Sequence, residues 1–261
     1  YNFRKDEFEA PYQEYRTIQQ ILEDPEQRHN KQFLQNLRVE YRAAIEKSQE
    51  QLIQDLNVVS EQLKQGNLQE YNWGRDEFVV FNFDRHLYQP LIHVADGAVG
   101  ITVKPAHLNK HEKKFIDDLK TWCQANAEGF LDGKELYVLR NQSRGKGISF
   151  FEEGNFYPDF IVWLLDNETQ YVTFIDPHGL RHARSFDDSK IRFSQTIKQI
   201  EQERLRDDTV VLNSFILSPT RYGEISHWAG GADMQIFHEH NVLFMYDDED
   251  YVSMLFGKVH V

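Results

Sequence analysis

The sequence predicts an α/β domain in which helices flank a mixed β-sheet, preceded by a long helical extension. After residue 66, short runs rich in β-branched and aromatic residues alternate with segments of helical periodicity. Before residue 66 there is no glycine from Tyr12 to Leu63, and apolar residues recur at spacings of three and four. We therefore expect residues 1–70 to form a helical arm or linker and residues 71–261 to form the layered domain.

The expected arm is one long helix with a single buried stripe. The triplet Asp24-Pro25-Glu26 has the form of a cap, a first-turn proline and an acidic first turn, so the helix is predicted to begin there. This pattern favours a helical hairpin or an arm that packs on a neighbouring domain over a regulatory coiled coil. The stripe comprises Leu34, Leu37, Tyr41, Ile45, Leu52, Leu56, Val59 and Leu63.

The layered domain is predicted to alternate strands with helices. Strands are expected at residues 78–83, 87–94, 136–140, 156–165, 171–175, 210–217 and 242–245, and helices at residues 108–125, at residues 185–206 and after residue 245. Residues 166–169 are polar and compact, which predicts that the strands on either side form a hairpin.

Composition and charge restrict the classes of function. The net charge of −13 argues against a surface that grips nucleic acid everywhere, because phosphate binding requires clustered Lys and Arg. The longest apolar run, residues 160–165, is far shorter than the roughly 20 residues that span a bilayer, so we expect no membrane association. Cys123 is the only cysteine, which excludes an internal disulfide and favours a reducing, cytoplasmic location.

Two aspartates flank the predicted hairpin. Pro158-Asp159 opens the first strand, and Asp176-Pro177-His178 closes the second. The start of one hairpin strand lies beside the end of the next, so Asp159 and Asp176 should meet at one end of the sheet. Two adjacent carboxylates repel each other unless they share a proton or a cation. Mg²⁺ prefers such oxygen ligands, and the Pro177 carbonyl is available as a third.

These residues resemble a known nuclease signature. Pro158-Asp159, sixteen intervening residues and Asp176-Pro177-His178 are similar to the PD-(D/E)XK motif, with His in the usual Lys position. Together with residues 84–91 and 108–115, the pattern resembles the C-terminal nuclease region of type III restriction-subunit and phage-defence helicases, over residues 76–261. The resemblance implies a restriction-endonuclease-like fold and a DNA endonuclease that uses Mg²⁺, with Mn²⁺ as a possible substitute. It also implies a helicase or translocase partner in the same or another chain.

The resemblance assigns further roles. Glu112 matches the family's acid on the first helix, and its alternative interpretation is a first-turn residue favoured by the helix dipole. His178 departs from the family, because an imidazole acts as a base but carries only partial positive charge at neutral pH. Lys198 or Lys190 on the next helix could supply the missing charge; otherwise the site has lost activity. In the loop after residue 140, Arg140, Arg144 and Lys146 are candidates for contacts with the nucleic-acid backbone, or the loop is a plain surface hairpin.

Other patterns lead to different hypotheses. His238-Glu239-His240 is predicted to put two histidines on one face of a strand, with His227 upstream. This set lacks the converging ligands of a zinc site and indicates structural histidines. Two functional alternatives to a nuclease remain. One is a catalytically inactive nuclease fold that binds DNA or docks onto a motor, and the other is an interaction protein that works through its helical arm.

Overall fold

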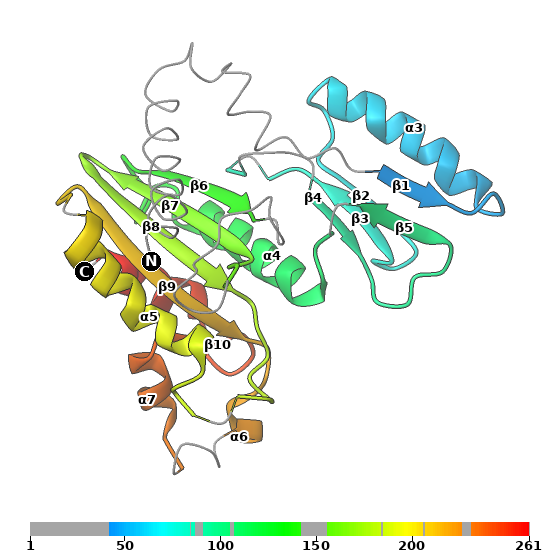
Figure 1. The fold of residues 1–261 in the computed structure, drawn as a ribbon. Helices are drawn as coiled ribbons and strands as arrows, with labels where there is room; N and C mark the ends of the chain where they lie inside the picture. Colours follow the sequence, from blue (N-terminus) through cyan, green and yellow to red (C-terminus); the bar gives the residue numbers. More distant parts are fainter. Residues whose placement is uncertain are drawn as a thin grey trace, which may run out of the picture. The chain divides into compact units, whose positions relative to one another are not determined.

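A computed structural model describes most of the chain after residue 41. The described residues are 42–83, 85–86, 91–104, 107–141, 156–183, 185–205, 207–225 and 231–260. The described chain forms two compact units, of which the first ends at Lys120 and the second begins at Thr121 (Figure 1). Each unit is described by itself below.

The N-terminal unit packs one helix against short strands. β2 (Glu70–Trp73), β3 (Phe78–Phe81) and β4 (Leu91–Val94) form an antiparallel sheet, and β1 (Arg42–Ile45) pairs with β5 (Ile101–Lys104). Helix α3 (Glu50–Lys64) and the strands contribute to one core. Its buried residues are Leu52, Val59, Leu68, Phe78, Val80, Ile92, Val94, Ile101 and Val103.

This arrangement corrects the prediction of one long helix. Residues 42–45 form a strand paired with β5, and residues 46–49 separate that strand from α3, so the predicted helix is wrong over residues 42–49. Within α3, the prediction of a buried apolar stripe is confirmed, because Leu52 and Val59 are buried. Their partners are strands β2–β5, so the described chain does not divide at the predicted boundary after residue 70. The part of the predicted arm before residue 42 lies outside the described residues.

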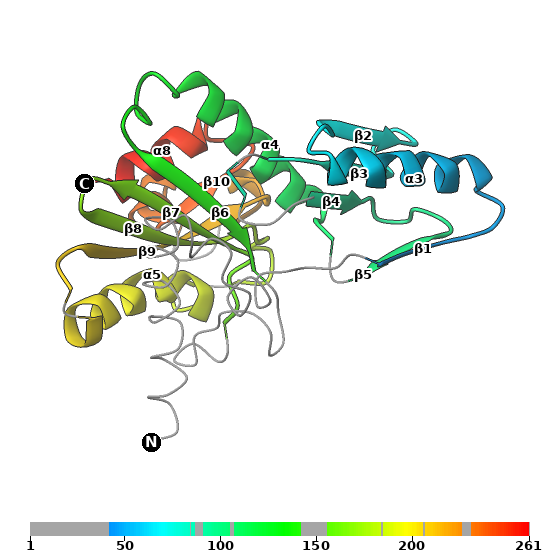
Figure 2. The same ribbon diagram turned by 90° about the horizontal axis from the view of Figure 1, so that it is seen from above.

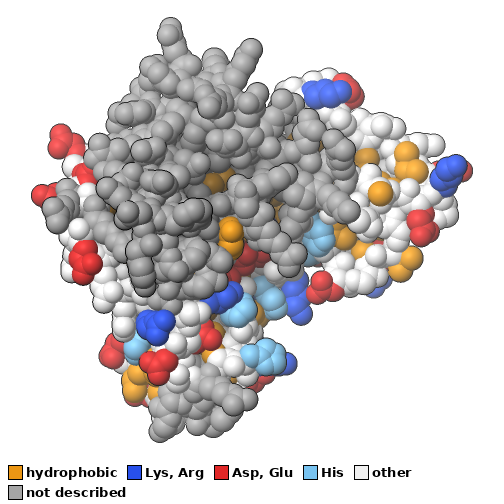
Figure 3. Space-filling model, in the orientation of Figure 1, with side chains coloured by type: hydrophobic (Ala, Val, Ile, Leu, Met, Phe, Trp, Pro, Cys, Tyr) orange, Lys and Arg blue, Asp and Glu red, His pale blue; other side chains and the backbone are white. Residues whose placement is uncertain are grey.

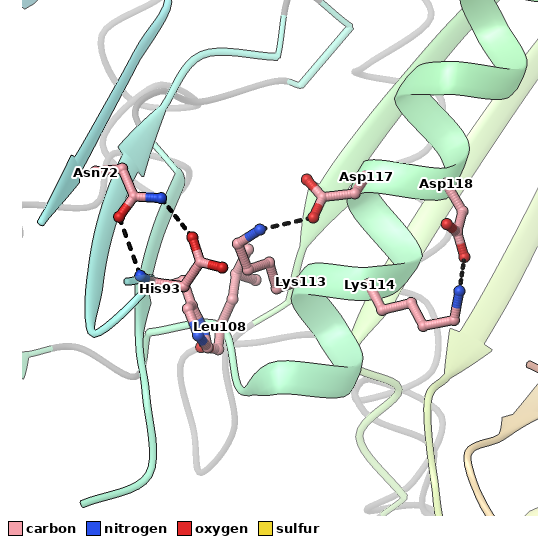
Figure 4. A network of polar contacts seen from close by, with 8 residues as sticks. Asn72, His93, Leu108, Lys113, Lys114, Asp117 and Asp118 are labelled. Atoms are coloured by element: carbon pink, nitrogen blue, oxygen red, sulfur yellow. Dashed lines mark hydrogen bonds and ion pairs between the residues drawn. The ribbon is translucent and has the colours of Figure 1, made fainter. Parts of the chain in front are cut away.

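Polar contacts anchor the start of helix α4 (Lys110–Ala125) (Figure 4). The ring of His93, on β4, donates a hydrogen bond from Nδ1 to the Leu108 carbonyl at 2.6 Å, and Leu108 N–H donates to the Ile92 carbonyl at 2.8 Å. On the helix itself, Lys113 and Lys114 pair with the aspartates four residues later, at 2.7 Å in each case. The helix therefore begins where the sequence pattern predicts it, next to a strand of its own unit.

The C-terminal unit is built on a five-stranded mixed sheet. The strand order is β10-β9-β8-β7-β6, in which β6, β7 and β8 are antiparallel neighbours and β8, β9 and β10 are parallel. The strands are β6 (Glu135–Arg140), β7 (Phe160–Asp166), β8 (Thr169–Asp176), β9 (Val210–Ser218) and β10 (Val242–Phe244). These bounds confirm the predicted strands of this unit to within a few residues.

A tight turn sets the register of β7 and β8. Asp166 pairs with Thr169 and Phe160 pairs with Ile175, which confirms the predicted hairpin. Asn167 in the turn has a φ of 53°. Asparagine adopts this left-handed conformation more readily than most residues, so the turn suits its sequence.

Helices cover both faces of this sheet (Figure 2). Helix α5 (Ser189–Ile200) lies on one face, continues as a π-helical turn (Glu201–Leu205) and buries four apolar residues, among them Phe193, which contacts Phe174 of β8. Helix α8 (Tyr251–Val259) lies on the other face. There the Phe256 ring stacks on Trp122 from the last turn of α4, with centroids 4.2 Å apart. The predicted α/β architecture, with helices flanking a mixed sheet, is therefore present. Among the described helices, none has the length and apolar character needed to cross a bilayer.

The tip of the hairpin is tied to the end of α8. His260 Nε2 donates to Asp166 Oδ2 at 2.6 Å, and Lys134 Nζ lies 3.5 Å from the same oxygen. The hydrogen bond from His260, assisted by the charge of Lys134, holds the pKa of Asp166 below its usual value. A lowered carboxyl pKa stabilises the fold above the ordinary pKa of aspartate, and this contribution is lost as the pH falls through the lowered value.

We predict that Asp166→Asn lowers the unfolding free energy at pH 7 by about 1 kcal/mol, because it removes a charge-assisted hydrogen bond near the surface. The same substitution should flatten the acid side of the stability profile. Urea denaturation between pH 3 and 7 measures both effects. Glu168→Gln, at the exposed neighbouring turn position, is the matched control and should change neither. An equal effect of the two substitutions would contradict the assigned contact.

Candidate active site

The two predicted aspartates lie at the same end of the C-terminal sheet. Asp176 is the last residue of β8 and is only 2% exposed. Asp159 precedes β7 by one residue, and continuing the ladder beyond the Phe160–Ile175 pair places it opposite Asp176. Residues directly opposite in a ladder project to the same face of the sheet. The hairpin on which the prediction depended is confirmed, and the sharing of a cation by both carboxylates stays a prediction.

Lys190 from α5 contacts Asp176. Its Nζ donates to Asp176 Oδ2 at 2.7 Å and lies 3.3 Å from His178 Nδ1. The helix starts at this point because the carboxylate of Asp188 accepts a hydrogen bond from Lys190 N–H at 3.0 Å, an N-cap that fixes the first turn. Of the two lysines considered from the sequence, Lys190 therefore reaches the site. Lys198 pairs with Glu201 at 3.1 Å instead.

His178 carries an imidazole whose neutral form is favoured. Protein atoms around the ring desolvate it and lower its pKa, the Asp176 charge acts in the opposite direction, and the Lys190 charge lowers the pKa further. Because the ammonium of Lys190 has only donors, Nδ1 of His178 is the acceptor in their contact, and the ring proton resides on Nε2. The residue as a whole is nevertheless exposed.

Asn141 positions the Pro-Asp segment, a role that the sequence analysis missed. Its side-chain Nδ2 donates to the Pro158 carbonyl at 2.9 Å and its backbone N–H donates to the Asp159 carbonyl at 2.8 Å. Asn141 is 4% exposed. The signal in the sequence was a single amide directly after the strand that pairs with β7, and the sequence pattern had assigned it to the polar loop after residue 140.

The loop between His178 and α5 is held against the end of β9. Leu180 N–H donates to Thr220 Oγ1 at 3.1 Å. A Cβ atom at Gly179 would lie 3.2 Å from the same oxygen, so the close approach of the two loops favours glycine there. Pro177 is buried in this loop. These contacts restrict the segment that carries His178.

Other predicted site residues lie elsewhere. Glu112 is 3% exposed and belongs to the N-terminal unit, where it forms a capping box with Asn109. Its Oε2 accepts from Asn109 N–H at 2.9 Å, and its own N–H donates to Asn109 Oδ1 at 3.0 Å. Arg140 is buried at the end of β6, where it donates to the Asn141 carbonyl. Arg144 and Lys146 lie outside the described residues.

The histidines near the C-terminus have structural contacts. His238 lies on helix α7 (Met234–Glu239), which corrects the predicted strand, and His240 follows as its C-cap. The helix forms because Asp233 caps it, accepting from Ile236 N–H at 3.1 Å. His238 Nε2 contacts Asp248 at 3.0 Å, and the His240 ring stacks on Phe186 with centroids 4.2 Å apart. His227 lies outside the described residues.

The donor atoms at the aspartate end of the sheet suit a hard cation. Asp159 and Asp176 carry carboxylate oxygens and Pro177 a backbone carbonyl, which are the kinds of donor that Mg²⁺ prefers. Within the described ranges, no group of three or more His, Cys, Asp or Glu side chains is arranged to hold a metal ion. The carboxylate of Asp176 is paired with Lys190, so the site already contains one positive charge.

Comparison of the chain with protein-family models, with curated proteins and with solved structures gave no match.

We predict that Lys190→Met destabilises the C-terminal unit by about 1–2 kcal/mol, because it leaves the buried Asp176 carboxylate without this cation while Lys190 itself is partly exposed. Native-state hydrogen exchange of the β8 and β9 amides measures the loss locally. Lys198→Met on the same helix removes a more exposed ion pair and should cost less than about 1 kcal/mol. Equal protection in the two variants would show that the Asp176 contact does not stabilise the fold.

The histidine gives a second prediction. In an NMR titration, the midpoint of His178 should lie below the ordinary histidine value of 6.5, and Lys190→Met should raise it by removing a neighbouring positive charge. Since the folded-state pKa is lowered, this group contributes stability above pH 6.5, and that contribution is lost as the pH falls below it. A midpoint above 6.5 in the native protein would contradict the assignment of a neutral ring.

Proposed function

We propose that the C-terminal unit is a Mg²⁺-dependent DNA endonuclease domain with a restriction-endonuclease-like fold. The observation that carries the proposal is the cluster at one end of the sheet. The buried Asp176 ends β8, Asp159 directly precedes the neighbouring strand β7, and Lys190 contacts both Asp176 and His178. Carboxylates, an ammonium group and an imidazole therefore lie at one end of the sheet. Each of these kinds of group can contribute to phosphodiester hydrolysis, by holding a metal ion, by stabilising charge on the phosphate or by accepting a proton from water.

The order of elements supports the proposed fold. The helix α4 is followed by the antiparallel strands β6, β7 and β8, then by α5 and the parallel strand β9. The pattern of residues predicted this order of helix, three strands, helix and strand. In this order, Asp159 and Asp176 belong to neighbouring strand ends and α5 follows them in the chain, which supports the proposed chemistry.

Different residues of the chain would bind the metal, stabilise charge on the phosphate and accept a proton. Asp159, Asp176 and the Pro177 carbonyl would hold Mg²⁺, or Mn²⁺ in its place. When bound, the cation would act as a Lewis acid on a phosphoryl oxygen. Lys190 would balance the charge that develops on the phosphate, a role that the family gives to Lys at the position of His178. With the Lys190 ammonium moved from Nδ1 to the phosphate, the neutral His178 would accept a proton from the attacking water at Nδ1.

Affinity for DNA would come from outside this cluster. The chain carries a net charge of −13, and on the face in Figure 3 the described Lys and Arg side chains are interspersed with Asp and Glu. Contacts by Arg144 and Lys146 with the DNA backbone remain part of the proposal. A helicase or translocase, in the same or a partner chain, would deliver the DNA, in the cytoplasm where Cys123 stays reduced.

One observation favours an alternative. The Asp176 carboxylate is paired with Lys190, and no third carboxylate or imidazole joins the aspartates among the described residues to complete a metal site. This would suit a catalytically inactive nuclease fold that binds DNA or docks onto a motor. The experiment below separates the two candidates.

The test is incubation of the purified protein with supercoiled and linear DNA, with Mg²⁺ or Mn²⁺ and with or without EDTA. The native protein should cleave in a metal-dependent way, and Asp176→Asn and Asp159→Asn should lower the rate by about 10²-fold or more, since each removes a ligand charge. Asp187→Asn, at an exposed position before α5, is the control and should cleave normally. DNA binding without cleavage under all conditions would establish the inactive alternative.

The roles of Lys190 and His178 give a separate prediction. Lys190→Met should lower the cleavage rate by about 10²-fold at saturating metal, because it removes the ammonium that contacts both Asp176 and His178 and would stabilise the charge on the phosphate. His178→Ala should also cleave more slowly, by about 10²-fold if the imidazole is the base. Lys198→Met should cleave like the native protein, since Lys198 pairs with Glu201. A normal rate in His178→Ala would remove the imidazole from the mechanism.

A further inference from the structure

The Asp176 carboxylate forms an ion pair with the ammonium group of Lys190. Lys190 Nζ lies 2.7 Å from Oδ2, and the Asp176 side chain is 3% exposed whereas that of Lys190 is 33% exposed. The pair is thus buried on the carboxylate side and open on the ammonium side. A metal ion that used this oxygen would have to replace the ammonium, because the two positive charges repel each other at such separations.

Lys190 has a second partner within reach. His178 Nδ1 is 3.3 Å from Nζ, and the Phe156 ring centroid is 5.6 Å from it. Both a neutral imidazole nitrogen and an aromatic face attract an ammonium group. The backbone of Lys190 is held by the Asp188 cap, so the change of partner requires movement of the side chain alone.

We propose that Lys190 is a tethered cation that competes with Mg²⁺ for Asp176 and transfers to His178 when the metal binds. The inference rests on the proposed function, since it concerns the metal site of that proposal. Lys190 neutralises the buried carboxylate until a metal ion takes its place. The displaced ammonium would then pair with the imidazole, whose Nδ1 lies 3.3 Å from Nζ.

Lys198 provides a built-in comparison. It lies on the same helix, and its carboxylate partner Glu201 also accepts a hydrogen bond from the backbone N–H of Leu212 on β9. Lys198 therefore serves a structural contact away from Asp176. Removing it changes the net charge by the same amount as removing Lys190, so it controls for the general effect of charge on metal affinity.

The experiment titrates Mg²⁺ alone into the intact chain and measures its dissociation constant by calorimetry. Lys190→Met should bind Mg²⁺ about tenfold more tightly than the native protein, the size expected for loss of one competing ion pair. Lys198→Met should bind like the native protein, and Asp176→Asn should lose binding. In the native protein, the ¹⁵N resonance of His178 Nδ1 should shift as Mg²⁺ is added. This shift is measured without any substitution, so it tests the inference even if a variant fails to fold.

The outcomes separate the inference from the proposed function. Mg²⁺ binding that requires Asp176 but is equal or weaker in Lys190→Met would overturn the inference and leave the proposed function standing. An unmoved His178 resonance on saturation would overturn it as well. Binding by Lys190→Met but not by the native protein would support it, because the tethered cation would then outcompete Mg²⁺. Absence of Mg²⁺ binding in both proteins would overturn the inference and the proposed function together.

Discussion

The register of the β7–β8 ladder is the constraint on which the candidate active site depends. The pairing continues from Asp166–Thr169 at the turn to the end where Asp159 comes level with Asp176. Side chains alternate in direction along a strand, so a slip of one residue would turn Asp176 to the opposite face, away from α5 and Lys190. The turn with its left-handed Asn167, and the contact of Asp166 with His260, oppose such a slip from the far end of the sheet. Residues remote from the site therefore determine its geometry.

Burial of Asp176 then imposes an electrostatic requirement. A carboxylate removed from water is costly unless it is paired or hydrogen-bonded, and Lys190 supplies the pair. The position of Lys190 follows from the packing of α5, because Ile191 and Phe193 are fully buried and the Asp188 cap fixes where the helix begins. Packing of the apolar face of α5 thus positions Lys190 next to the buried carboxylate at the end of β8.

Local patterns predicted much of the C-terminal unit and less of the site. The hairpin, β9 and α5 could be predicted because their periodicity and turn residues act within short segments. The stripe of α3 shows that one face is buried but not what covers it, so strands β2–β5 were missed as its partners. Sequence alone could not choose between Lys190 and Lys198, since the choice depends on where α5 lies against the end of β8. Two helix caps nevertheless have recognisable sequence patterns, Asp188 before α5 and the Asn109–Glu112 capping box before α4. The second pattern favours the structural interpretation of Glu112.

The side chain of Lys190 is better suited to a contact that can be exchanged than to a permanent one. An ammonium is a compact charge on a flexible stem with three rotatable donors, so it can contact Asp176 and His178 from one position. An Arg at this place would present a rigid fork that binds a carboxylate through two parallel hydrogen bonds, which is harder to displace. Partial exposure of Lys190 also lets water solvate the ammonium as it leaves, which lowers the cost of the exchange. The pair can therefore stabilise the fold while leaving the Asp176 carboxylate accessible to a cation that binds it more strongly.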